Sequence, residues 1–300
     1  GYNRTREKLR PLETLGVRAL PDARAVAAAA DVVVLAVKPY QTAAVLEELR
    51  PALNPHKVLV SVAAGVNMGR LTAAVEGRCP VVRCMPNTPA LVGKGVFAFC
   101  FDDPALSPDT RDLLLQVFGC LGLCIPLPEA RFTAFSALVG AGPAYVFAMM
   151  QGLVQAGVTL GLQHAEARRM VVALFAGSAL MAEKSSKHLM QLRDDVCSPA
   201  GLTIAGVNAL DQAGPGADIH AVRRPGADAR AIGERRAGEL PVQRPAQVLQ
   251  ETAQEHAHLL PADRVVRPEA LGAVAVRDTV CNGPPYRLAV PLALQIGEGQ

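Results

Sequence analysis

VVVLAV, residues 32–37, lies between Asp31 and the pair Lys38-Pro39 and decides the fold of this chain. A continuous run of β-branched and aliphatic residues is typical of a strand buried on both faces of a parallel sheet. Two similar runs follow it along the chain, Val58–Ala63 and Val81–Cys84. Helical patterns alternate with these runs over Ala23–Ala30, Tyr40–Leu49 and Met68–Val75. Strands and helices that alternate across short turns predict an α/β fold with a doubly wound parallel sheet.

The pattern changes at Pro126–Glu129, after a further strand-like run at Val96–Phe101 and an amphipathic helix at Arg111–Leu121. Helical stretches then dominate, over Pro143–Leu160, Ala165–Ala182, His188–Asp195 and Thr203–Asp211. Beyond them, residues 215–300 contain nine prolines and no lysine, and Tyr286 is their only aromatic residue. We therefore expect a sheet domain over 1–127, a helical domain over 128–214 and an atypical tail over 215–300. The tail is either disordered or foreign to the fold, as a shifted reading frame would make it.

The composition excludes several classes of protein. Half of the 300 residues are hydrophobic, which supplies a sizeable core and excludes a disordered chain. The net charge of +3 gives no basic surface for nucleic acid, and charges such as Asp31 interrupt the apolar runs. We therefore expect neither a nucleic-acid partner nor a membrane span. The seven cysteines form no C-x-x-C pair and have no histidine at ligand spacing, which favours buried thiols in the cytoplasm over disulfides or a metal site.

Three candidate ligand-binding turns follow the three buried strands. They are Ala36-Val37-Lys38-Pro39, Ser61–Val66 and Arg83–Pro89, the last of which contains Asn87 and Thr88. Open α/β sheets bind ligands at the carboxyl ends of their strands, and small residues there let a cofactor approach the backbone. A single turn of this kind is equally consistent with an ordinary connection, but the three together favour a nucleotide site.

The first residues carry donors suited to a phosphate group. Asn3, Arg4 and Thr5, followed by Arg6, stand where a dinucleotide-binding sheet meets the adenosine ribose. Guanidinium and hydroxyl groups suit a 2′-phosphate, which favours NADP(H); the alternative is a solvated basic segment. A G-x-G-x-x-G turn would precede Gly1, so we expect the first strand and helix of the fold to be missing from this sequence.

Two further candidate turns lie at the starts of helices. Residues 140–145 (GAGPAY) open the first long helix, and residues 198–203 (SPAGLT) precede the last one. Exposed amides at a helix N-terminus attract carboxylate or phosphate, and the hydroxyls of Ser198 and Thr203 add hydrogen bonds or a proton. The alternatives are an interdomain joint with Pro143 in the first helical turn, and a turn in which Thr203 is a simple N-cap.

These motifs, in this order, resemble those of pyrroline-5-carboxylate reductases over residues 1–213. The resemblance implies a Rossmann-type domain followed by an all-helical dimerisation domain that interlocks with the same domain of a second subunit. It also implies that dimers join into rings. It implies NADPH as the cofactor, with NADH possible, and 1-pyrroline-5-carboxylate as the small-molecule substrate. The sequence departs from the family pattern at Val139–Gly142 and at Pro199–Thr203, and residues 215–300 do not resemble the family.

The resemblance also implies which residues meet the cofactor. Asn3, Arg4 and Thr5 would contact the 2′-phosphate. The nicotinamide end would be lined by Ala36, Val37, Lys38, Pro39, Asn87 and Thr88.

For the substrate, the resemblance implies Ser198, Gly201 and Thr203, which would bind its carboxylate and its imine nitrogen. Ser198 and Thr203 are the candidate catalytic residues, and the Thr203 hydroxyl would donate to the imine nitrogen. Two rival interpretations stay open at this point. One is another imine or 2-hydroxyacid oxidoreductase of the same fold, and the other is a non-catalytic fragment of the reductase.

Overall fold

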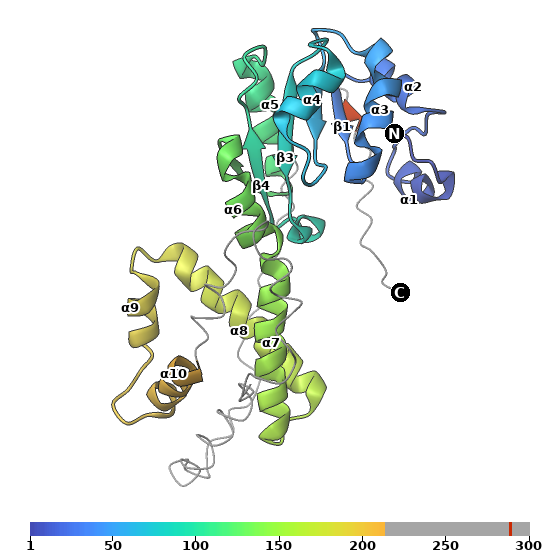
Figure 1. The fold of residues 1–300 in the computed structure, drawn as a ribbon. Helices are drawn as coiled ribbons and strands as arrows, with labels where there is room; N and C mark the ends of the chain where they lie inside the picture. Colours follow the sequence, from blue (N-terminus) through green and yellow to red (C-terminus); the bar gives the residue numbers. More distant parts are fainter. Residues whose placement is uncertain (214–287, 290–300) are drawn as a thin grey trace, which may run out of the picture. The chain divides into compact units, whose positions relative to one another are not determined.

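The computed structural model describes residues 1–213 and 288–289, which belong to two compact units (Figure 1). The first unit comprises Gly1–Ala141 with the strand at 288–289, and the second begins at Gly142. The sequence predicted a boundary between residues 127 and 128. The first unit extends further because residues 129–141, here called the connector, pack against it through the buried side chains of Phe132 and Phe135.

The first unit contains one mixed sheet with the strand order β5-β4-β3-β2-β1-β6. The strands are β1 Val32–Leu35, β2 Val58–Ser61, β3 Val81–Met85, β4 Gly95–Cys100, β5 Gly122–Pro126 and β6 Leu288–Ala289. β1, β2 and β3 run parallel, as the three apolar runs predicted. β6 pairs parallel with β1 and is the only described part of the predicted tail, whose remaining residues lie outside the described chain.

β4 departs from the predicted parallel sheet, because it runs antiparallel to β3. Only residues 86–94 connect the two strands, and they contain the short helix η4 (Thr88–Val92), which ends at Gly93 in a left-handed conformation. A parallel crossover needs a dozen residues or more, so this connection reverses the chain instead. β5 then pairs parallel with β4.

Helices cover both faces of the sheet, as a doubly wound fold requires. Alternate strand residues point to opposite faces: Val33 and Leu35 join one core, and Val32 and Val34 join the other. The first core is covered by α2 (Ala23–Ala29), α3 (Thr42–Leu49), α4 (Met68–Val75) and α6 (Phe132–Phe135). The second core is covered by α5 (Pro108–Gly119), through Leu114 and Phe118. All four residues of β1 are therefore buried.

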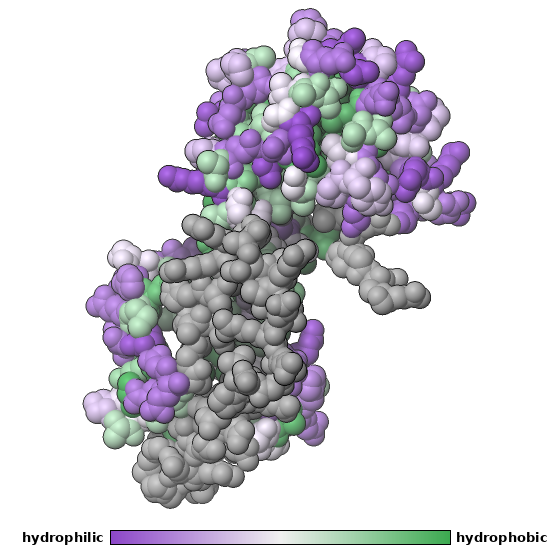
Figure 2. Space-filling model, viewed as in Figure 1, coloured by the Kyte–Doolittle hydropathy of each residue, from purple (hydrophilic) through white to green (hydrophobic). Residues whose placement is uncertain are grey.

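The helices of the first unit begin where the sequence supplies caps. Asp22, Asn67 and Ser107 each accept a backbone N–H in the first turn of α2, α4 and α5. Short helices complete the unit: η1 (Arg6–Leu9), α1 (Arg10–Glu13), η2 (Pro39–Gln41), η3 (Arg50–Ala52), η5 (Glu129–Arg131) and the π-helix η6 (Ser136–Gly140). On the face seen in Figure 2 the outer side of this unit is mainly hydrophilic.

The second unit is helical in its described part, as predicted. It contains α7 (Gly142–Thr159), α8 (His164–Lys184), α9 (Leu189–Asp194) and α10 (Leu202–Ala213). α7 and α8 pack through a small core of Val154, Ala167 and Val171. Many large apolar side chains of these helices remain exposed, including Phe147 (63%) and Met181 (61%).

The helical run Glu129–Thr159 is long and apolar enough to cross a membrane by length and composition alone. No membrane-spanning segment was predicted from the sequence. The run begins with the connector, whose Phe132 and Phe135 pack in the core of the first unit. It continues into α7, in which only Val154 and Ala156 are buried within the described chain.

Candidate functional site

The three predicted strand-end turns lie along one edge of the sheet. The parallel registers place Leu35 beside Ser61 and Ser61 beside Arg83. The turns that follow these residues therefore emerge at the same carboxyl edge, which is where α/β sheets bind ligands. The structure brings together Ala36–Pro39, the turn at 62–66 and the residues after Met85, as the sequence predicted.

The turn after β1 presents an exposed cation. Lys38 has an extended backbone, with ψ of 146°, because the following Pro39 disfavours a helical conformation. The backbone N–H of Lys38 donates to Oε1 of Gln41 at 3.3 Å, which fixes the start of η2. The side chains of Lys38 and Tyr40 are exposed, so the ammonium group is accessible to an anionic ligand.

The turn after β2 leaves its backbone accessible. Ser61 is fully buried, and its hydroxyl accepts the backbone N–H of Ala63 at 3.4 Å. Gly65 has φ of +74°, which a glycine adopts at little cost, and open space surrounds the position that a Cβ would take. α4 then begins at Met68, with Asn67 accepting the backbone N–H of Arg70 at 2.9 Å.

The turn after β3 is held by Asn87. Its Oδ1 accepts the backbone N–H of Val96 at 2.9 Å, and its Nδ2 donates to the carbonyl of Val139 at 3.3 Å. Asn87 therefore joins β4 and the π-helix of the connector to the end of β3. Its predicted contact with a cofactor stays a prediction, while the adjacent Thr88 presents an exposed side chain.

The N-terminal segment has the predicted donor character. Oδ1 of Asn3 accepts the backbone N–H of Thr5 at 2.9 Å, which closes a tight turn. This turn leaves Arg4, Thr5 and Arg6 exposed. The carbonyl of Gly1 accepts the backbone N–H of Leu20 at 2.9 Å, so the segment is anchored to the first unit just before the turn.

In the second unit, the stretch 198–203 leads into α10, as predicted, and its last two residues already belong to the helix. The helix begins at Leu202, so Thr203 lies in its first turn and is not the N-cap that one alternative proposed. The side chains of Ser198 and Thr203 are exposed. The first main-chain bond of the helix runs from Ala205 N to Gly201 O, and the preceding amides of the first turn have no partner within the helix. Hydroxyls and amides of this kind suit a small carboxylate.

The geometry of this turn constrains two of its residues. A Cβ at Gly201 would lie 2.3 Å from Oγ of Ser198, so only glycine fits there without displacing the serine. Ala200 has φ of 55°, a left-handed conformation that is unfavourable for a residue with a side chain. The backbone at 200 is thus one that glycine would adopt with less strain.

Replacing Ala200 with glycine is therefore expected to stabilise the protein by about 0.5–1 kcal/mol, because it relieves the left-handed strain. The control is Ala205→Gly, which lies inside α10 and is expected to destabilise by a similar amount. Urea unfolding of both variants measures the two changes. Equal destabilisation by both substitutions would contradict the strain at residue 200.

Ion pairs join the helices on either side of the turn. The Arg193 guanidinium binds Asp194 through two nitrogens, at 2.9 and 3.0 Å, and Nη1 lies 3.7 Å from Oδ2 of Asp211 on α10. Lys187 pairs with Asp195 at 2.6 Å. These exposed pairs link α9 to α10 and to the residues before it, and exposed pairs contribute little stability individually.

The glycine-rich stretch 140–145 also starts a helix as predicted. α7 begins at Gly142, and Pro143 stands in its first turn, where the missing N–H costs no hydrogen bond. Gly140 packs beside the end of β3, because a Cβ there would lie 3.3 Å from Cε of Met85. No contact in the described chain tests the predicted anion-binding role of this stretch.

The buried cysteines do not supply a nucleophile. Burial raises the pKa of Cys79 to about 11 and that of Cys100 to about 11, so both thiols stay protonated at neutral pH. Cys84 is buried, and burial raises its pKa well above the usual value. Within residues 1–213 and 288–289, no cluster of three or more histidine, cysteine or acidic residues suits a metal ion.

Two surface hollows of the first unit lie elsewhere. One of about 300 Å³ is lined by residues of α5 and the preceding loop, including Phe101 and Arg111. The other, of about 660 Å³, lies between α4 and residues 102–105. Neither of these two hollows is lined by a residue predicted to bind ligand.

One ion pair beside these turns, between Arg83 and Glu129, was not predicted from the sequence. Glu129 Oε1 contacts Nη1 of Arg83 at 2.8 Å, and the Arg83 guanidinium lies 4.6 Å from the centre of the Phe132 ring. A usable signal was present, since Arg83 is the only charged residue in β3 and a cation in a buried strand needs a compensating partner. The sequence alone did not indicate that the partner lies beyond β5.

The chain is similar to proteins of known family. A family model described as pyrroline-5-carboxylate reductase dimerisation matches residues 129–229, and one described as NADP oxidoreductase, coenzyme F420-dependent, matches residues 1–65. The pyrroline-5-carboxylate reductase of Glycine max is 38% identical over 202 residues, which cover 67% of this chain and 73% of the relative. That of Pseudomonas aeruginosa is 40% identical over 186 residues, covering 62% and 68%.

Solved structures agree with the sequence relatives. A pyrroline-5-carboxylate reductase from Coxiella burnetii matches with a TM-score of 0.69 and 32% identity, over 74% of this chain and 83% of that one. The Plasmodium falciparum pyrroline carboxylate reductase, solved with NADP bound, matches with a TM-score of 0.64 and 30% identity, over 68% and 78%.

Proposed function

Because the chain belongs to the pyrroline-5-carboxylate reductase family, we propose that it reduces 1-pyrroline-5-carboxylate to L-proline with NADPH, the last step of proline biosynthesis. The observation that carries this proposal is the 38% identity to a reductase of that name across 73% of its length. The strand-end turns of the first unit supply groups suited to the cofactor. The turn at 198–203 in the second unit supplies groups suited to the substrate.

The residues of the first unit fit NADPH. Residues 3–6 carry guanidinium, hydroxyl and amide groups and no carboxylate, which suits a 2′-phosphate better than a free ribose hydroxyl. Ala36–Pro39 and the turn after β2 present small residues and an open backbone at the ligand edge. When bound there, the cofactor supplies the hydride. Asn87 holds the neighbouring turn, and Thr88 adds an exposed hydroxyl.

The residues of the second unit fit the substrate. The carboxylate would be bound by the Ser198 hydroxyl and the first-turn amides of α10, while Gly201 leaves room for the serine side chain. Reduction adds a hydride to the imine carbon and a proton to the nitrogen. The Thr203 hydroxyl would donate a hydrogen bond to the imine nitrogen, pass it the proton as the hydride reaches the carbon, and regain a proton from water.

The preference for NADPH is expected to depend on Arg4. Arg4→Ala should raise the KM for NADPH about tenfold and leave the KM for NADH within about twofold, because a charge-assisted contact to the 2′-phosphate is lost. Arg24→Ala, which removes an exposed arginine from α2, is the control and should change neither value. Steady-state kinetics with both cofactors measures the effect, and equal losses for NADPH and NADH would contradict the role of Arg4.

The chain forms a homo-oligomer through its helical part, as the match to the dimerisation family over 129–229 supports. Exposed apolar residues on α7 and α8, such as Phe147, Met170 and Leu174, are consistent with a helical protein interface. We propose a dimer as the basic assembly and rings of dimers as the larger one. The free thiols of Cys79, Cys84, Cys100, Cys124 and Cys197 support a place in the reducing cytoplasm.

The experiment that tests the function is proline formation from 1-pyrroline-5-carboxylate and NADPH by the full chain, detected by mass spectrometry of the product. A set of other cyclic imines and 2-oxo acids, assayed in parallel, separates this activity from that of another oxidoreductase of the same fold. A folded chain that forms no proline and oxidises NADPH with none of these compounds would overturn the proposal and favour a non-catalytic protein.

A further inference from the structure

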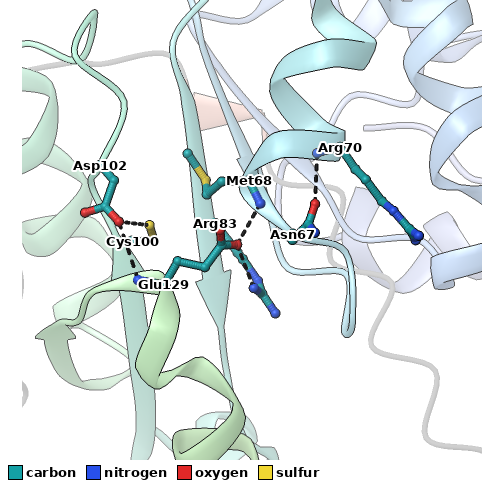
Figure 3. A network of polar contacts seen from close by, with 7 residues as sticks. All are labelled: Asn67, Met68, Arg70, Arg83, Cys100, Asp102 and Glu129. Atoms are coloured by element: carbon teal, nitrogen blue, oxygen red, sulfur yellow. Dashed lines mark hydrogen bonds and ion pairs between the residues drawn. The ribbon is translucent and has the colours of Figure 1, made fainter.

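The carboxylate of Glu129 joins separate segments of the first unit, as Figure 3 shows. Its Oε1 accepts the backbone N–H of Met68 at 2.7 Å and pairs with Nη1 of Arg83 at 2.8 Å. The backbone N–H of Glu129 donates to Oδ2 of Asp102 at 3.4 Å, and the same oxygen accepts from the Cys100 thiol at 3.2 Å. One residue of the connector therefore contacts α4, β3 and the loop after β4.

Arg83 needs this partner. Its side chain is 12% exposed and stands on β3, between β2 and β4 in the sheet. A cation at this depth is unfavourable unless it is paired, and its two contacts, the Glu129 carboxylate and the Phe132 ring, both come from the connector. The buried charge of Arg83 therefore holds the connector against β3, because without Glu129 the guanidinium would be left unpaired.

Both ends of the connector contact the same strand. At its start, Glu129 pairs with Arg83 in the middle of β3, and near its end the carbonyl of Val139 accepts from Asn87 just beyond the strand. Gly140 packs against Met85, the last residue of β3. Two of the three candidate cofactor turns are tied to this segment, one through the Met68 amide at the start of α4 and one through Asn87.

We propose that Glu129 is a positioning residue for the cofactor, acting with Arg83 through the turns that follow β2 and β3. This inference rests on the proposed function, because it assigns the two turns to NADPH. Glu129 does not contact the cofactor itself. Its carboxylate fixes where α4 begins, and the residues just before α4 form the open backbone at the ligand edge.

The test compares NADPH binding by the full chain and by Glu129→Ala, measured as a dissociation constant by fluorescence titration. We expect the dissociation constant to rise about tenfold in Glu129→Ala, because the loss of a contact that supports a binding site weakens binding even when that contact does not touch the ligand. Glu129→Gln keeps an acceptor for the Met68 amide but removes the charge, so it should restore part of the affinity. Glu76→Gln breaks the exposed Arg50–Glu76 pair at the other end of α4 and is the matched control, expected to bind as the wild type does.

Hydrogen exchange gives a readout that is independent of the cofactor. In Glu129→Ala the amide of Met68 should exchange about tenfold faster, while the amide of Arg70, which Asn67 caps, should keep its rate. A variant that merely lowers overall stability would speed both amides together, and that result would overturn local positioning.

The outcomes separate the inference from the proposed function. If the wild type binds NADPH and forms proline while Glu129→Ala binds NADPH equally well, the positioning role is wrong and the function stands. If the folded wild type neither binds NADPH nor forms proline, the proposed function fails and the cofactor role of Glu129 fails with it. A raised dissociation constant with partial recovery in Glu129→Gln supports the inference.

Discussion

Replacing Thr203 with valine is expected to lower kcat for 1-pyrroline-5-carboxylate about 100-fold, the lower end of what a positioned proton donor contributes. Valine keeps the shape of threonine and removes only the hydroxyl. The side chain is exposed in the first turn of α10, so the substitution leaves no cavity in the described core. The KM for the substrate should change little if the carboxylate is bound mainly by Ser198 and the helix amides.

The conservative variant and a matched control complete this experiment. Thr203→Ser keeps the hydroxyl and should retain kcat within about fivefold of the wild type. Thr159→Val removes an exposed hydroxyl that only bonds the carbonyl of Gln155 inside α7, and it should leave kcat unchanged. If Thr203→Val keeps wild-type kcat, the hydroxyl has no role in proton donation or orientation, and the nitrogen receives its proton from another source.

The second large effect concerns stability, and Gly122→Ala is expected to cost about 3 kcal/mol or to prevent folding of the unit. Gly122 stands opposite Gly95 in the β4–β5 pair and has φ of +145°. A Cβ there would lie 2.0 Å from the carbonyl oxygen of Gly95 and 2.5 Å from its nitrogen. Both are backbone atoms, so β5 would have to move away from β4.

Gly119→Ala is the control, because Gly119 ends α5 and a Cβ there meets nothing within 4 Å. It is expected to leave stability unchanged or to raise it by about 0.5–1 kcal/mol, through the better helix propensity of alanine. Urea unfolding measures both variants, and loss of a cooperative transition in Gly122→Ala counts as the expected result. A midpoint equal to that of the wild type would show that β5 tolerates a side chain at this position.

The sequence predicted the centre of the sheet because burial on both faces leaves a continuous apolar run. β1, β2 and β3 each show one, and α4 was predicted with its observed bounds because Asn67 and a clear amphipathic pattern mark it. β5 was not predicted, since its apolar run is only the three residues Leu123–Ile125 between Gly122 and Pro126, which is too short to distinguish a strand from a turn. The connector was not predicted either. It passes from a 3-10 helix through a short α-helix to a π-helix, so its sequence keeps no single helical period.

The candidate site could be predicted in part. Because parallel strands end at one edge of a sheet, Ala36–Pro39 and Asn87 could be placed at that edge from the order of the strands alone. The contacts that hold those turns could not, since the partners of Arg83 and Asn87 lie far along the chain, at Glu129 and Val139. Pairing across such distances depends on the tertiary fold, which no local pattern encodes.

The double attachment of the connector has a consequence for recombination between reductases. A chimera that exchanges helical parts at residues 127/128 would separate Glu129 from Arg83 and Val139 from Asn87, and each partner would then come from a different parent. A crossover between Ala141 and Gly142 keeps both contacts within one parent. The crossover that preserves these contacts therefore lies after the π-helix and not at residues 127/128, where the sequence pattern changes. Libraries of hybrid enzymes built at the later crossover should contain the larger share of folded members.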